Sequence, residues 1–142
     1  MSDKIKKSRL ITGNLRSNDN RGKIFSILNI SSKNVSIIDC NKGSIRSNHY
    51  HYTDWHYMFV LFGRINYFFM SVNKKNINYI PVTKNDIIFT PPLEIHATHF
   101  PVKTRLIVCS KNKRDKKTYE NDTKRVDFID ENNINYYLKN YK

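Results

Sequence analysis

The chain has 142 residues and a formal net charge of +13. This length suits one domain with a core of its own, and a hydrophobic share of 39% is above that of a disordered chain. No apolar run is long enough to span a bilayer, and the first residues, MSDKIKKSRL, lack the apolar centre of a secretory signal. The sequence therefore predicts a single cytoplasmic domain, residues 1–142, that does not enter a membrane.

The cysteines and the basic residues narrow the partners. Cys40 and Cys109 lie far apart without a CxxC pair, which favours a reducing compartment, and Cys109 is expected to be a buried, inert thiol. The one dense basic run, KNKRDKK (111–117), has no interleaved aromatic residues to stack on bases. We therefore expect solvated surface lysines and no nucleic acid, and keep a small anion such as a diphosphate as the other reading of the charge.

Short β-rich segments separated by Gly, Asn, Asp and Pro follow one another along the chain. Ile, Val, Phe and Tyr dominate them, as is typical of strands. In chain order they are IFSILNI, VSIID, WHYMFVLF, INYFFMSV, INYIPV, DIIFT and TRLIVCS. This pattern predicts antiparallel strands in a two-layer, all-β sandwich or barrel, with a core at about residues 23–128.

The tail, IDENNINYYLKNYK, is the one segment with a helical pattern. We predict a helix at about 130–141 with Asp130 as its N-cap. Its apolar face is made of residues three and four apart, namely Ile134, Tyr137, Leu138 and Tyr141.

All five histidines fall in two short segments. His49 and His51 are two apart, so in a strand both rings project from one face. A turn at 53–54 returns the chain, and His56 then faces the same interior if it shares the face of Met58. His96 opens another apolar segment, and His99, three residues on, points to the other face. Converging imidazoles suit either a transition-metal site or general-base catalysis.

The spacing of these residues resembles the two cupin motifs. The first motif keeps every interval, with His56 where the family usually has Glu; its residues are Gly43, His49, His51, His56 and Gly63. The second keeps Pro and His but has lost both glycines and the closing Asn; its positions are Asn85, Pro91, Leu93, His96 and Phe100. The resemblance implies an all-β cupin jelly roll, a double-stranded β-helix, with a short C-terminal helix.

Three further segments look like the nucleotide-sugar branch of the cupins. They are DNRGKIFSI, IRSNHYH and, less diagnostic, SKNKRDKKTYENDTKRVDF. This branch includes the 3,5-epimerases and 3,4-ketoisomerases of dTDP-4-keto-6-deoxy sugars and capsule-sugar epimerases. The resemblance implies an isomerase or epimerase that removes a proton next to the ketone of a nucleotide-linked 4-keto-6-deoxy sugar, with no cofactor required.

The resemblance also implies roles for particular residues. His49 or His51 is the base, and Arg46 meets the diphosphate. Tyr57 and Tyr67 are the candidates for the acid. Trp55 and Arg64 are further candidates for substrate binding, although a Trp beside a turn is also expected to pack on the edge of the core. Glu94 is expected either to orient an imidazole or to be a solvated turn residue.

Two rival functions remain at this stage. In metal-binding cupins the ion is held at the positions of His49, His51, His56 and His96, which predicts a divalent transition metal such as zinc, nickel, iron or copper in an oxygenase or another metalloenzyme. The other rival is a sugar-binding cupin without activity. A homodimer is expected in each case, because the strands HYMFVLF and INYFFM are more apolar than one core requires.

Overall fold

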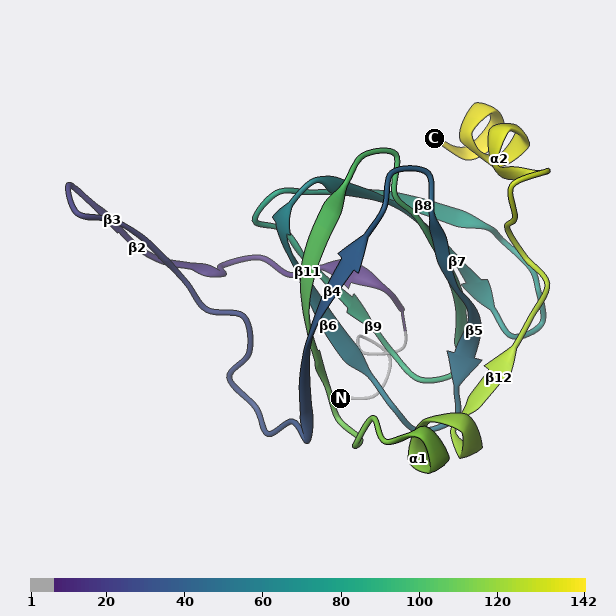
Figure 1. Ribbon diagram of the computed structural model, residues 1–142, viewed down its shortest axis with the longest axis horizontal. Helices are drawn as coiled ribbons and strands as arrows, with labels where there is room; N and C mark the ends of the chain where they lie inside the picture. The colour runs from purple at the N-terminus through teal and green to yellow at the C-terminus, as the bar shows by residue number, and fades with distance from the viewer. Residues whose placement is uncertain (1–6) are drawn as a thin grey trace.

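Two antiparallel five-stranded sheets face each other and enclose a barrel interior (Figure 1). The computed structural model describes residues 7–142; residues 1–6, part of the segment predicted not to be a signal, lie outside it. The first sheet contains, in spatial order, β1 (Arg9–Leu10), β9 (Ile87–Thr90), β6 (His56–Phe62), β11 (Thr104–Ser110) and β4 (Asn34–Cys40). The second contains β12 (Thr123–Arg125), β5 (Ile45–His51), β10 (Glu94–His99), β7 (Arg64–Ser71) and β8 (Asn78–Thr83).

This arrangement confirms the predicted all-β jelly roll with a short C-terminal helix. Most predicted strands form, because their alternating side chains bury one face between the sheets. The interior is apolar over much of its length, with Val60, Ile65, Val82 and Leu106 nearly inaccessible to solvent. Within residues 7–142, no helix is both long and apolar enough to cross a bilayer.

The predicted limits of the core need correction at the N-terminal end. β1 lies before residue 23 and completes the first sheet against β9. Residues 26–30 of the predicted strand IFSILNI are irregular. Only its beginning is extended, in a separate hairpin of β2 (Leu15–Asp19) and β3 (Gly22–Phe25) that projects away from the barrel (Figure 1).

The helices also differ from the prediction. α2 spans Ile134–Tyr141, and its N-cap residue is Asn133 and not Asp130. The Asp130 carboxylate instead accepts the backbone N–H groups of Asn132 and Asn133, which closes a turn before the helix. A further helix, α1 (Lys116–Asn121), was missed; Asp115 caps it by accepting the N–H of Thr118.

The C-terminal segment covers the outer face of the second sheet. Ile129, Ile134 and Tyr137 pack on Phe68 and Met70, which point outward from β7. This contact accounts for the apolar surplus of INYFFM within one chain. The prediction that this strand forms a dimer interface is therefore wrong, because its outer face is already covered.

The second motif keeps its backbone shape without its glycines. Asn85 and Leu93, at the two glycine positions, have φ of 72° and 58°, in the left-handed region that favours glycine. In the first motif, Gly63 also has a positive φ, and a Cβ there would come within 2.6 Å of the Lys103 carbonyl oxygen. The turns that position the strands are thus those of the motif, although the sequence departs from it.

Leu93→Gly is expected to raise the free energy of unfolding by no more than about 1.5 kcal/mol. Relief of the left-handed strain, about 1–2 kcal/mol, is offset by the greater chain entropy of glycine in the unfolded state, about 0.5–1 kcal/mol. Leu93→Val, with a β-branched side chain at φ of 58°, is expected to destabilise the fold. Urea unfolding of both variants checks this. Leu15→Val in the extended β2 is the matched control; equal effects of valine at the two positions would contradict the interpretation.

Candidate active site

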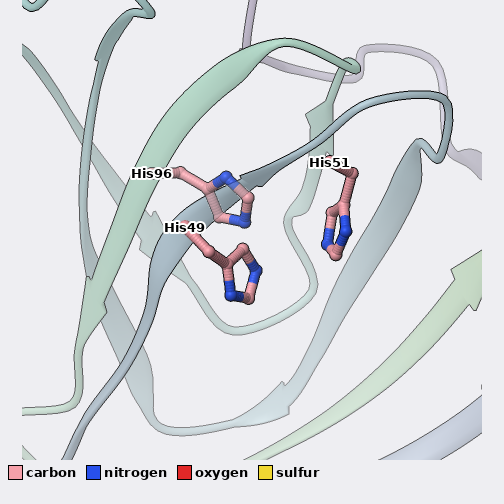
Figure 2. A group of neighbouring side chains, drawn as sticks. All are labelled: His49, His51 and His96. Carbon is pink, nitrogen blue, oxygen red and sulfur yellow. The ribbon is translucent and has the colours of Figure 1, made fainter. Parts of the chain in front are cut away.

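Four imidazoles converge inside the barrel. His49, His51 and His96 come from neighbouring strands of the second sheet, and His56 comes from the start of β6 in the first sheet. The side chains are 8%, 2%, 0% and 4% exposed for His49, His51, His96 and His56. Figure 2 shows the first three rings pointing into one common space. Their ligand atoms all lie within 4.8 Å of one another.

A bulge in β5 helps to set the direction of the rings. The pairing of β5 with β10 shifts beside Asn48, and Ser47 and Asn48 both have positive φ. Asn48 is held from outside by the C-terminal segment: its side chain donates to the Ile129 carbonyl at 2.8 Å and accepts the Ile129 N–H at 3.0 Å. The segment that covers the sheet therefore also fixes the strand that carries His49 and His51.

Hydrogen bonds fix the tautomer of His51. The Thr123 hydroxyl donates to the Tyr119 carbonyl, so its oxygen can only accept from Nδ1–H of His51, at 3.2 Å. Nε2 of His51 then carries a lone pair. This nitrogen is buried and has no hydrogen-bond partner in the described part of the chain. His51 thus offers an unused basic nitrogen to the interior.

His96 is fixed in the same way. Its Nδ1–H donates to the Glu94 carbonyl at 3.0 Å, which leaves the Nε2 lone pair to accept from His56, 3.4 Å away. His56 therefore donates from Nε2–H, and its Nδ1 carries the lone pair. This Nδ1 is buried and has no hydrogen-bond partner in residues 7–142. His56 and His96 are therefore joined by a hydrogen bond between their Nε2 atoms.

Burial keeps all four imidazoles neutral. Desolvation lowers the pKa of His96 to about 3 and lowers the pKa of His49, His51 and His56 as well. The neighbouring imidazoles and the guanidinium of Arg114 act in the same direction. Neutral imidazole is the form that accepts a proton or binds a metal.

A cavity of about 140 Å³ opens beside the histidines. His49 and His56 line it together with Arg114 and Tyr119, and Met58, Phe100, Leu106 and Val108 form its apolar wall. The exposed Arg46 also lines it, with its guanidinium weakly bound to the Asp39 carbonyl at 3.4 Å. The cavity is small beside the roughly 300–1,000 Å³ typical of drug-sized ligands. It therefore admits only a small part of a larger molecule.

Two of the predicted residues lie near the cluster. Arg46 lies where an anionic group outside the cavity can reach it. Tyr67 stacks on His96 with ring centroids 6.2 Å apart, but its hydroxyl is buried between Ser8 and Thr90 at 2.7 and 2.6 Å. Burial also raises the pKa of Tyr67, so its proton is held within this network.

Three other predicted residues lie outside the cavity, which corrects their assignment. Tyr57 alternates with His56 and Met58 on β6, points to the opposite face, and packs on Phe89 with centroids 4.8 Å apart. Trp55 packs edge-on against Tyr57, in agreement with the second expectation, that this Trp packs on the edge of the core. Arg64 is exposed at the start of β7. His99 points away from the cluster, as predicted, and its Nδ1 accepts from Asn66 at 3.0 Å.

Glu94 has neither of the two environments expected for it. Its carboxylate is 5% exposed and accepts the backbone N–H of Ser8 at 3.0 Å and the Ser8 hydroxyl. Burial raises its pKa to about 7, although these bonds act in the opposite direction. Its backbone carbonyl, not its carboxylate, orients His96. Glu94 and His96 are two apart on β10, and this spacing was the available sign that both face the interior.

Sequence reasoning missed Arg114 and Tyr119. Arg114 belongs to the basic run 111–117 that was expected to lie in solvent, Tyr119 follows it by two residues, and both line the cavity. Tyr119 contacts the rings of His51 and His49, with centroids 5.5 and 6.2 Å away. Burial raises the pKa of Tyr119. It is thus a tyrosine beside the two histidines, in the position sought for Tyr57 or Tyr67.

Comparison with known proteins gives matches of structure and none of sequence. No protein-family profile and no curated protein matches the sequence. A 3,4-ketoisomerase from Helicobacter canadensis matches with a TM-score of 0.70 and 18% identity, over 84% of this chain and 91% of the other. QdtA, a sugar 3,4-ketoisomerase from Thermoanaerobacterium thermosaccharolyticum in complex with TDP, matches with a TM-score of 0.69 and 18% identity, over 93% and 92%.

A third match is the capsular polysaccharide assembling protein CapF from Staphylococcus aureus. Its TM-score is 0.62 with 20% identity, over 84% of this chain and 35% of CapF. A variant of QdtA has also been solved with TDP-4-keto-6-deoxyglucose. At these identities the likeness shows the fold, and it is the fold that the cupin resemblance implies.

Proposed function

We propose that this protein is an isomerase acting on a nucleotide-linked 4-keto-6-deoxy sugar. The observation that carries the proposal is the pair His49 and His51. His49 lines a cavity that admits a small ligand group, and the ring of His51, whose buried Nε2 has no hydrogen-bond partner in residues 7–142, lies 4.6 Å from that of His49. Such a nitrogen is free to take a proton from carbon. Sugar 3,4-ketoisomerases share the fold, and QdtA is bound to TDP and, as a variant, to TDP-4-keto-6-deoxyglucose.

The chemistry needs no external oxidant or reductant. A histidine of the pair takes the proton from C3, the C–H electron pair forms a C3–C4 double bond, and the carbonyl pair moves to the C4 oxygen, giving an enediolate. Return of the proton to C4, with transfer of the proton on the C3 oxygen to the C4 oxygen, gives the 3-ketone, an isomer of the substrate. Two adjacent imidazoles suit the two carbon sites, and Tyr119 is a hydroxyl donor beside them.

Arg46 is proposed to bind the diphosphate. It is exposed at the lining of the cavity, so an anionic group held there stays outside while the sugar enters. Incubation with TDP-4-keto-6-deoxyglucose in heavy water tests the function: NMR is expected to show the 3-keto isomer with deuterium at C4, and remaining substrate with deuterium at C3. The proposal is overturned if NMR shows neither the 3-keto isomer nor any uptake of deuterium into the sugar.

A bound transition metal is the second candidate, favoured by the clustered nitrogens of His49, His51 and His96. His56, the fourth residue predicted as a ligand, lies outside this group of three. Ligand atoms within 4.8 Å are somewhat wider apart than the roughly 3.4 Å between nitrogens on tetrahedral zinc, so small rotations of the rings fit the group. The residues therefore fit a metal. When bound, such an ion would polarise a ketone as a Lewis acid.

Metal analysis separates the two candidates. Protein purified without chelator or affinity metal is expected to hold far less than one equivalent of metal if the imidazoles act as bases. Near one equivalent, lost in the His49→Ala, His51→Ala double variant, would instead establish the metal candidate. The metal content of a His99→Ala control is expected to equal that of the wild type.

We also propose that the protein is a homodimer in the cytoplasm. Free, buried thiols at Cys40 and Cys109 are in keeping with a reducing compartment. The projecting hairpin supports the dimer: Leu15 and Ile24 on it are 45% and 46% exposed, and a two-stranded hairpin is marginal in water without a surface to pack on.

The Leu15→Glu, Ile24→Glu double variant is expected to elute as a monomer where the wild type elutes as a dimer, with light scattering giving the masses. Charges at these positions oppose burial against a second copy. Tyr136→Glu, 58% exposed on α2, is the control and is expected to stay dimeric. A monomeric wild type, or a dimeric double variant, would count against the hairpin as the dimer contact.

A further inference from the structure

Arg114 is a half-buried cation in the cavity, and its hydrogen-bonding capacity is only partly used. Nη2 lies 3.0 Å from the Asp54 carboxylate, and the guanidinium lies 5.1 Å above the ring of Tyr119. Nε and Nη2 are buried, and neither makes a hydrogen bond of good geometry with any residue from 7 to 142. A buried N–H left unbonded costs about 1–3 kcal/mol, more for a charged group. The guanidinium therefore has room for an acceptor from a ligand.

The position of Arg114 is fixed from behind. Asp54 is 3% exposed and also accepts the backbone N–H of Asn112 at 2.9 Å. The ion pair thus ties the segment before α1 to the turn between β5 and β6. Because that turn lies between the strands that carry His51 and His56, the cation and the histidines belong to one rigid arrangement.

Arg114 is also distinct from Arg46, the other arginine that lines the cavity. Arg46 is exposed, whereas the side chain of Arg114 is 20% exposed. The cavity of about 140 Å³ is too small for a whole nucleoside diphosphate-sugar, so the group that reaches Arg114 is of the size of a sugar ring. Arg114 is therefore expected to contact an oxygen of the sugar and not the phosphates.

We propose that Arg114 donates to the ketone oxygen of the sugar and stabilises the negative charge that develops there when a neighbouring histidine takes the proton from C3. This proposal rests on the proposed function. A fixed, desolvated donor at the developing oxyanion stabilises the transition state more than the ground state. The imidazoles are neutral, so the cations that line the cavity are Arg46 and Arg114, and Arg114 is the less exposed of the two.

The test uses paired substitutions, because Arg114→Gln alone leaves the buried Asp54 carboxylate without its partner. Arg114→Gln with Asp54→Asn removes both charges and keeps polar side chains. Arg105→Gln with Asp39→Asn removes the matched exposed pair, whose atoms are 2.7 Å apart on the outside of the barrel. Isomerisation and exchange of the C3 proton are measured with TDP-4-keto-6-deoxyglucose, and TDP binding is measured by calorimetry.

In the Arg114, Asp54 variant, kcat and the exchange rate are expected to fall by about 10²–10³-fold, while the Kd for TDP changes by less than about threefold. The outer-pair variant is expected to match the wild type in both readouts. A fall in kcat of less than tenfold would overturn the proposal. A loss of TDP affinity as large as the loss of kcat/KM would also overturn it, because Arg114 would then be a phosphate ligand.

Oxalate binding separates failure of this proposal from failure of the proposed function. Oxalate is a planar dianion that resembles an enediolate, and its binding is measured on protein shown to be metal-free. If the wild type turns over no sugar nucleotide, the proposed function fails. An oxyanion site would still be supported if the wild type and the outer-pair variant bind oxalate and the Arg114, Asp54 variant binds it more than tenfold more weakly. Equal oxalate affinity in all three proteins, or none in the wild type, would overturn it.

Discussion

Replacing His51 by asparagine is expected to lower kcat and the exchange rate of the C3 proton by about 10²–10⁴-fold, the usual contribution of a general base. The Nε2 lone pair is lost, whereas the amide of asparagine can keep the hydrogen bond to Thr123. His49→Asn is expected to have an effect of the same order, because its ring lies 4.6 Å from that of His51 and lines the cavity. NMR in heavy water measures both rates.

His99→Asn is the matched control for these variants. His99 is on the same strand as His96 but faces the other side, where it binds Asn66. Its substitution is expected to leave kcat within about twofold of the wild type. Normal exchange in both His49→Asn and His51→Asn would show that neither imidazole takes the proton.

The free energy of unfolding is expected to fall steeply as the pH drops below 6.5. The unfolded chain takes up protons on its histidines near pH 6.5, whereas the folded chain keeps four of them neutral because their pKa is lowered. Their contribution is present above pH 6.5 and is lost as the pH falls. Each imidazole lowers the free energy of unfolding by up to about 1.4 kcal/mol per pH unit. Urea unfolding is therefore expected to show that this free energy falls by several kcal/mol between pH 7.5 and 5.5.

Glu94 opposes this trend without reversing it. Its pKa is raised to about 7, so its contribution is present when the carboxyl is protonated and is lost as the pH rises toward 7. One carboxyl offsets only part of the effect of four imidazoles. Glu94→Gln is therefore expected to deepen the loss between pH 7.5 and 5.5 by about 1–2 kcal/mol. Equal stability of the wild type at the two pH values would contradict the neutral, buried state of the cluster.

The cluster was predictable because strand periodicity and motif spacing act on the same residues. The two-residue step from His49 to His51 and the alternation along β6 place these rings and His56 on the interior face. The same alternation excludes Tyr57, the immediate neighbour of His56, as its outward contact with Phe89 shows. That error could have been avoided from the sequence alone.

The residues of the site that follow β11 were not predictable in this way. Arg114 and Tyr119 follow β11 in a segment without strand periodicity, and their place depends on contacts distant in sequence, such as the ion pair with Asp54. A basic run of this kind usually lies in solvent. The start of α2 was misplaced for a local reason: Asp130 is a good N-cap residue, but its carboxylate closes a turn before the helix instead.

The bond between Ser8 and Glu94 has a consequence for how the chain folds. These residues are 86 apart in sequence, and β1, which follows Ser8, is the strand that completes the first sheet. Contacts of such high sequence separation pay a large loop-closure entropy before they gain any energy, and they make folding slow. We expect refolding to show a late phase in which the N-terminal strand docks and the Glu94 carboxyl leaves water. Before that phase the histidines would lie in a barrel whose first sheet still has β9 unpaired at its edge.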